Sequence, residues 1–162
     1  MKIEDQVCSL ELAKSLRKFD VKQESIFWWC KAYLNSKNPS IWKICLRDED
    51  FFYSPRLDND IFSAFTVSEL GEMLPKIITI ETDDDVKKIF SNFRFVEGKN
   101  TIVKENIPIE VWSVNYICDT TGELKNWLFD TLLTPAIYDK NEANARAKML
   151  IYLIKNGFIK HE

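Results

Sequence analysis

The chain has 162 residues, of which 46% are hydrophobic and 29% charged, a composition typical of a single globular domain spanning residues 1–162. The formal net charge of −3 argues against a surface that coats DNA or RNA, because such surfaces need a basic excess. No apolar run approaches the roughly 18 residues of a membrane span, and the first ten residues lack a signal-peptide pattern, so we expect a soluble cytoplasmic protein.

The cysteine and histidine content excludes several kinds of site. The cysteines are dispersed as Cys8, Cys30, Cys45 and Cys118, with no C-x-x-C pair, so we expect free thiols and no zinc site. The only histidine is His161, and a Ser-His-Asp or Cys-His site therefore has no base. The 4 glycines form no Gly-rich phosphate loop. We expect no catalytic residue, no bound metal and no cofactor.

A helix and a hairpin are predicted in the first part of the chain. Ser9 can cap the helix, whose apolar residues recur at helical spacing as Leu12, Leu16 and Phe19. Residues 25–33 and 41–46 are rich in aromatic and β-branched residues and predict an antiparallel hairpin. Trp28 and Trp29 then point to opposite faces. One should enter the core, and the other should be covered by a neighbour or left for a partner.

Residues 47–60 predict a polar loop that carries five carboxylates around an aromatic centre. Asp58 and Asp60 are spaced to clasp a hard cation such as Mg²⁺ or Ca²⁺, which prefers oxygen ligands. The EF-hand pattern fails, because its sixth position lacks Gly and its twelfth lacks Glu. Turn-forming and solubilising roles explain these acids more simply than a metal site does.

The middle of the chain predicts a helix, a strand and a second helix. Residues 66–69 (TVSE) form a capping-box pattern, which predicts a helix to Leu74 that Pro75 ends. Residues 76–81 (KIITIE) predict a strand. Asp residues at 83–85 favour the start of another helix, because carboxylates in a first turn complement the helix dipole. Its inward residues are expected to be Val86, Ile89, Phe90 and Phe93.

The pattern turns to β from residue 94. Residues 97–100 (EGKN) predict a hairpin turn between short strands. Residues 109–118 alternate regularly between two faces and form the clearest strand pattern in the chain. Residues 119–122 (DTTG) predict a tight turn, and residues 123–133 predict a strand followed by a helix.

The strongest pattern is the amphipathic helix predicted at residues 141–156. Asn141 is suited to its N-cap and Gly157 to its C-terminal end. Its small apolar residues come first and its large ones later, so it can approach a neighbour closely at its start. The apolar stripe consists of Ala143, Ala147, Leu150, Ile151 and Ile154.

Arginine and aromatic residues have the chemistry to bind an anionic or planar ligand. Arg146 lies at the edge of the apolar stripe, where it either pairs with a buried acid or reaches along the core edge. Alternatively, it lines a cavity and binds a carboxylate or phosphate. Arginine beside an aromatic ring can stack on a base and bind a phosphate. The candidate ligand-binding residues are Arg146, Trp28, Trp29, Arg47, Arg56, Arg94 and Trp112.

Three blocks of the sequence carry a resemblance: CSLELAKSL from Cys8, SAFTVSELGEMLP from Ser63 and NEANARAKMLIYLIKNGFI from Asn141. In their order and residue content they resemble a set of small proteins carried by bacteriophages and prophages of gut bacteria. The resemblance implies a phage or prophage origin and an intracellular setting. It implies no activity and brings no catalytic residues.

Together, the predicted elements indicate an α+β fold. A mostly antiparallel sheet is covered by helices, and the long C-terminal amphipathic helix packs on the sheet. The lack of a catalytic constellation and the many aromatic residues favour a non-catalytic, phage-encoded binding protein, such as a counter-defence protein that binds a host protein. One alternative is a sponge for a small nucleotide-like ligand. Another is a carboxylate- or metal-dependent enzyme that uses the acidic loop.

Overall fold

The computed structural model describes residues 2–32, 41–46, 61–84, 87–118 and 134–160, apart from the side chains of residues 32, 80–94 and 118. The helical segments are η1 (Ile3–Asp5), α1 (Leu10–Lys18), α2 (Val67–Met73) and α3 (Glu142–Lys155). The strands are β1 (Phe27–Ala32), β2 (Ile41–Leu46), β3 (Ile61–Ser63), β4 (Ile77–Asp84), β5 (Lys87–Lys104), β6 (Ile107–Cys118) and β7 (Ile137–Asp139). The predicted α+β fold is confirmed.

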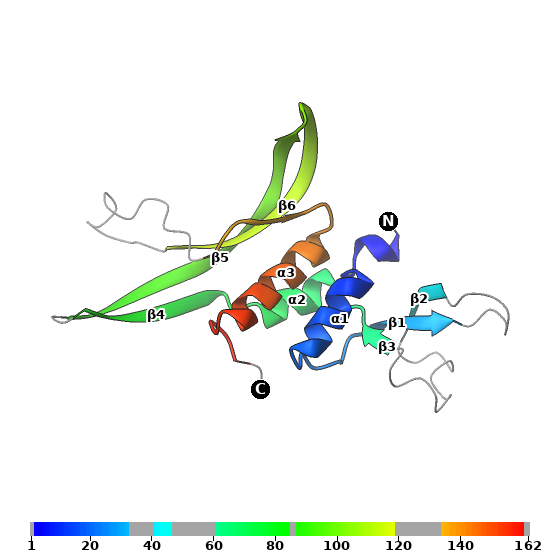
Figure 1. Ribbon diagram of the computed structural model, residues 1–162, viewed down its shortest axis with the longest axis horizontal. Helices are drawn as coiled ribbons and strands as arrows, with labels where there is room; N and C mark the ends of the chain where they lie inside the picture. The colour runs from blue at the N-terminus through cyan, green and yellow to red at the C-terminus, as the bar shows by residue number, and fades with distance from the viewer. Residues whose placement is uncertain (1, 33–40, 47–60, 85–86, 119–133, 161–162) are drawn as a thin grey trace.

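The strands form two antiparallel sheets, with the orders β2-β1-β3 and β4-β5-β6-β7. The predicted strands that fall within the described residues correspond to β1, β2, β4, β5 and β6, but they are divided between two sheets instead of sharing one. The helices lie between the sheets (Figure 1). Helix α3 is the central element, because it contacts α1, α2, β6 and β7.

Each helix begins where the sequence provides a cap. The Ser9 hydroxyl accepts a hydrogen bond from the Leu12 N–H at the start of α1. A complete capping box starts α2, since Thr66 and Glu69 exchange side-chain and main-chain hydrogen bonds. The side chain of Asn141 accepts the Asn144 N–H at the start of α3. These caps satisfy N–H groups that have no partner within the helix.

Helix α3 is buried more completely than its predicted stripe. Neighbouring elements surround it on several sides, so residues outside the stripe also enter the core. Alanine predominates in its first half, which permits close approach of α1 and α2. Gly157, at φ +72°, follows the helix in the left-handed conformation that glycine adopts readily. The buried residues of α3 are Ala143, Ala145, Ala147, Met149, Leu150, Ile151 and Leu153.

Side chains of α3 also fasten the start of the chain. The Asn144 Oδ1 accepts a hydrogen bond of 2.8 Å from the Ser9 N–H. The Asn141 Nδ2 donates to the carbonyl oxygens of Glu4 at 3.1 Å and Val7 at 3.3 Å. The N-terminal end of α3 is thereby fixed against the segment that leads into α1.

The helix predicted to begin at residues 83–85 is wrong. The chain forms an antiparallel pair of strands there, and the register of β4 with β5 runs from Ile77 opposite Arg94 to Asp84 opposite Lys87. The segment after residue 86 is rich in Ile and Phe, which favour strands when a pairing partner is available. The three aspartates alone suggested a helix start, and pairing with β4 overrides that local signal.

The turn predicted at residues 97–100 is also wrong. Strand β5 continues through Gly98, which lies opposite Ser113 of β6 in an extended conformation. The Ser113 hydroxyl donates to the Gly98 carbonyl oxygen at 3.4 Å. A Cβ atom added at Gly98 would meet nothing within 4 Å, so the strand accommodates this glycine without requiring it.

Several predictions fall on residues outside the described ranges. They are the turn at 119–122, the acidic loop at 47–60 with Asp58 and Asp60, and the strand and helix at 123–133. Strands β3 and β7 were not predicted, because three residues contain too little alternation to identify a strand.

Candidate functional site

The outer part of the β5–β6 hairpin, residues 97–113, projects from the body of the protein and is called the arm below (Figure 1). Strand β4 pairs with β5 only as far as Arg94, and β7 pairs with β6 only at residues 112–114. Between these limits and the tip, β5 and β6 pair only with each other among the described strands. Two paired strands form few tertiary contacts, so the arm is a surface more than a core element.

A two-residue turn, Glu105 and Asn106, closes the arm. It lies between Lys104 and Ile107, which are the last pair in the register of β5 with β6. Both turn residues have positive φ angles, 53° and 63°. This geometry is that of a type I′ turn, whose twist suits a two-residue hairpin. Asn106 adopts the left-handed region readily, whereas Glu105 does so at an energetic cost.

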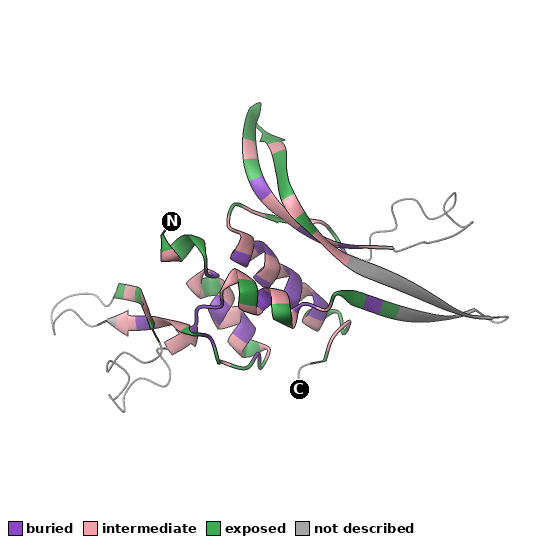
Figure 2. Ribbon diagram, turned by 180° about the vertical axis from the view of Figure 1, so that it is seen from behind, coloured by how far each residue is buried: buried purple, intermediate pink, exposed green. Residues whose placement is uncertain are grey.

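Large aliphatic side chains are exposed on both sides of this turn. Val103 is 71% exposed and Ile107 is 61% exposed, the two largest values among the exposed apolar residues described. Ile102 and Ile109 face each other in register and are partly buried. Figure 2 shows mostly exposed and intermediate residues along the arm, whereas α3 carries many buried residues. The tip therefore presents an aliphatic surface to solvent.

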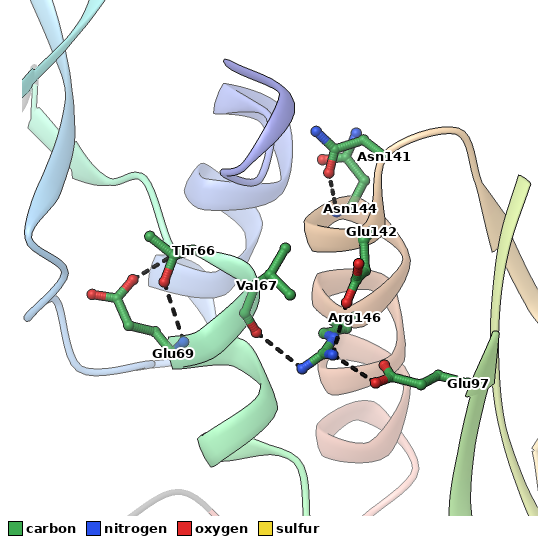
Figure 3. A network of polar contacts seen from close by, with 8 residues as sticks. All are labelled: Thr66, Val67, Glu69, Glu97, Asn141, Glu142, Asn144 and Arg146. Carbon is green, nitrogen blue, oxygen red and sulfur yellow. Dashed lines mark hydrogen bonds and ion pairs between the residues drawn. The ribbon is translucent and has the colours of Figure 1, made fainter. Parts of the chain in front are cut away.

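A guanidinium group fastens the base of the arm to the helices (Figure 3). The Arg146 Nη2 contacts the carboxylates of Glu97 at 2.6 Å and Glu142 at 2.8 Å. The Nη1 donates to the Val67 carbonyl oxygen at 3.0 Å. The Arg146 side chain is 13% exposed. It thus joins β5, α2 and α3, which is the ion-paired structural role considered for this residue.

The backbone of α2 leaves room for this arginine at Gly71. A Cβ atom on Gly71 would collide with the Arg146 Nη1. Burial raises the pKa of Glu97, although the charge of Arg146 acts in the opposite direction. Desolvation therefore outweighs the attraction of Arg146 in setting the Glu97 pKa, and the contact itself holds β5 beside α3.

A second ion pair lies beside the start of α3. Burial disfavours the charged form of Asp139, but hydrogen bonds from Lys148 Nζ at 2.6 Å, the Asn141 N–H at 2.9 Å and Asn144 Nδ2 at 3.3 Å outweigh it. Together they hold the Asp139 pKa below its ordinary value. This carboxylate therefore organises the entry into α3.

Trp112 lies on β6 at the base of the arm. The Lys99 ammonium is 5.4 Å from the centre of its ring. With Glu110, Val111 and Lys140, these two residues line a hollow of about 130 Å³. Sites for drug-sized ligands are usually about 300–1,000 Å³, so this hollow is small for a nucleotide.

The other candidate ligand-binding residues do not converge with Arg146 in the described part of the chain. Trp29 packs against the core and donates from Nε1 to the Cys8 carbonyl oxygen at 3.0 Å, while Trp28 is half-buried on the opposite face of β1. Arg94 lies in β5 between Ile77 and Ile117 in register, and its side chain is outside the described set. Arg47 and Arg56 are outside the described residues.

A cluster of cations and aromatic rings joins α1 to the smaller sheet. The Lys14 ammonium lies 4.8 Å from the Trp42 ring centre and 5.5 Å from that of Phe62. The Arg17 guanidinium lies 5.3 Å from the Phe62 ring centre. The cations already lie over the ring faces, so this cluster serves to hold the helix on the sheet.

The larger hollow described, about 300 Å³, lies beside α2 and is lined by Glu24, Ser25, Phe65, Glu69, Glu72 and Met73. Its three carboxylates would repel a phosphate. Glu69 already accepts hydrogen bonds from Ser25 Oγ and the Ile26 N–H. Across the described ranges, no group of three or more His, Cys, Asp or Glu residues is placed to hold a metal ion.

Sequence reasoning missed Val103 and Ile107, because it placed the turn at Gly98. A usable signal was present: the polar pair Glu105–Asn106 interrupts a run of alternating aliphatic residues, and Asn is favoured in type I′ turns. Recognising that turn would have placed both aliphatic residues at the exposed tip of a long hairpin.

In comparisons with known proteins, no family model, curated protein or solved structure matches the chain. Within the described residues, no helix has the length and apolar character needed to cross a bilayer. The functional proposal therefore depends on the geometry of the arm and its base.

Proposed function

We propose that this is a non-catalytic, phage-encoded binding protein that acts in the cytoplasm of a host cell and binds a host protein through the arm. The observation that carries the proposal is the exposure of Val103 and Ile107 at the tip. A counter-defence role, in which the bound host protein is blocked, follows the proposed phage origin.

The tip offers one highly exposed aliphatic side chain on each face, because Val103 lies opposite Pro108 and Ile107 lies opposite Lys104 in register. Fully burying an aliphatic side chain of this size is worth about 1.5–3 kcal/mol, so two such residues can supply much of the energy of a modest interface. Thr101, Lys104, Glu105 and Glu110 surround them with polar groups. A host protein that encloses the tip from both faces would bury both side chains inside this polar rim, which is the usual arrangement in protein interfaces.

The small-molecule alternative has less support. In the described structure, the guanidinium of Arg146 is engaged by Glu97, Glu142 and Val67. The hollow beside Trp112 is about 130 Å³ and the hollow beside α2 is lined by carboxylates. Neither combines enough space with free positive charge for a nucleotide.

The proposal is tested by cross-linking and capture from a lysate of a gut bacterium, with quantitative mass spectrometry. The variant Val103→Asp/Ile107→Asp should lose about tenfold or more of a specific captured protein, because charges at the tip prevent its burial. Ile26→Asp is the matched control, since Ile26 is 57% exposed and lies away from the arm.

Capture should be retained by the wild-type protein and by Ile26→Asp. Binding that is unchanged in the arm variant would contradict the proposal. So would an equal loss in both variants, because it would reflect added charge and not the tip.

A further inference from the structure

The outer edge of β5 is a row of main-chain groups with no strand beside it in the described structure. The Phe95 N–H donates to the Lys76 carbonyl oxygen at 3.0 Å, so the main-chain N–H of this odd-numbered residue of β5 points away from β6. Because main-chain direction alternates along a strand, the N–H and C=O groups of Lys99, Thr101 and Val103 point the same way. This edge can accept another strand.

The opposite edge of the arm is blocked. Pro108 lies opposite Val103 and has no N–H to donate. The pair next to the turn, Lys104–Ile107, is the hydrogen-bonded one in a two-residue hairpin, so the nitrogen of Pro108 faces outward. Proline at such a position commonly prevents pairing along an edge. Of the two edges of the arm in the described structure, the β5 edge is therefore the open one.

We propose that a second copy of this chain pairs along this edge, with β5 antiparallel to β5 and Thr101 opposite Thr101. The two arms then form one four-stranded sheet around a two-fold axis, in which each copy offers the same surface. This inference shares Val103 with the proposed host-protein site, but its readout is the oligomeric state of the purified protein alone, so each proposal can fail without the other.

The residues along the edge are complementary to themselves in this register. Lys99 lies opposite Val103, and Lys104 lies opposite Gly98, so neither lysine faces a like charge. Glu97 and Glu105 come opposite each other only at the end of the pairing, and Glu97 is ion-paired with Arg146 of its own chain. Lysines on edge strands usually discourage pairing, but here each lies opposite an uncharged residue. The aliphatic stem of Lys99 can also cover Val103, which is 71% exposed in the single chain.

The pairing also joins the aliphatic faces of the two arms. Ile102 and Ile109 lie on one face of the arm because they are opposite each other in register. Antiparallel pairing around a two-fold axis places the same face of both copies on the same side of the new sheet. The arm projects away from the helices in both views, which leaves its edge accessible (Figures 1 and 2).

The test is native mass spectrometry and light scattering over a concentration series of the full chain. The wild type should form dimers whose fraction rises with concentration. Thr101→Pro should weaken dimerisation by about tenfold or more, because it removes an outward N–H while the bonds to β6 remain. Thr101→Val keeps that N–H and should dimerise like the wild type.

A second test, based on exchanging charges, is needed because Thr101→Pro could lose dimerisation simply by unfolding the arm. Val103→Lys places a positive charge opposite Lys99 of the second copy and should weaken the dimer. Adding Lys99→Glu should restore it, because opposite charges then face each other. A wild type that stays monomeric, a Thr101→Pro protein that still dimerises, or a failed rescue would overturn the proposal.

Discussion

Arg146 joins three elements through one guanidinium group, and its position depends on the missing side chain of Gly71. An alanine in a helix interior normally stabilises it by about 1 kcal/mol relative to glycine. At Gly71 the added Cβ would collide with Arg146. The sign of one small substitution therefore reports whether the arginine occupies this place.

Gly71→Ala should lower the free energy of unfolding by about 1–3 kcal/mol, the usual cost of overpacking. Urea denaturation measures it. In the background of Arg146→Ala, the same substitution should become neutral or stabilising, because the collision partner is gone. Stabilisation by Gly71→Ala in the wild-type background would contradict the observed placement.

Asp139 should contribute to the pH dependence of stability. Folding lowers its pKa from the ordinary 3.8, so the folded state binds this proton less tightly than the unfolded state. Its contribution is present above about pH 5 and is lost as the pH falls through the lowered pKa. Asp139→Asn should flatten the loss of stability below pH 4, measured by urea denaturation at several pH values. Asp5→Asn, at an exposed position, is the control and should leave the profile as steep as in the wild type.

The sequence allowed a structural role for Arg146 but did not identify its distant partner. Glu142 is four residues away on the same helix, and such pairs can be read from spacing. Glu97 is reached only because β5 continues through residue 97 and passes beside α3. Because the sequence predicted a turn at residues 97–100, the contact between Glu97 and Arg146 could not be anticipated.

At the scale of elements, the turn of the arm is strained at Glu105, whose φ is 53°. Glu105→Asn should stabilise the arm by about 0.5–1 kcal/mol, because asparagine enters the left-handed region at lower cost. The amides of Ile102 and Ile109 should then exchange with solvent a few times more slowly. Glu105→Ala removes the charge but not the strain, and equal protection in that variant would contradict this cause.

Helices with caps were predictable, and the long strands were only partly so. Ser9, Thr66 and Asn141 provide local hydrogen bonds, and the structure uses all three. Strand β5 depends instead on cross-strand pairing with its chain neighbours β4 and β6, in which Ile77 lies opposite Arg94 and Phe93 lies opposite Cys118. Local signals at the aspartates and at Gly98 were therefore misleading, because the cross-strand pairing outweighs them.

At the scale of the whole molecule, the predicted packing of the terminal helix on a sheet is confirmed, but the division into two sheets was not predicted. Helix α3 contacts α1 and α2 as well as β6 and β7, so it connects parts of the fold that share no strand. Burial around such a helix exceeds one stripe, which explains why Ala145 and Leu153 are buried too. The spacing of apolar residues identifies the helix, but it does not show how many other elements pack around that helix.

The hydrogen bonds from Asn141 and Asn144 to the start of the chain have a consequence for protein synthesis. A ribosome adds about 5–20 residues per second, so α1 emerges on the order of ten seconds before α3 is made. During that interval the apolar side of α1, with Ala13 and Leu16, lacks the helix that covers it in the finished protein. The nascent chain is then a substrate for molecular chaperones until its last helix arrives.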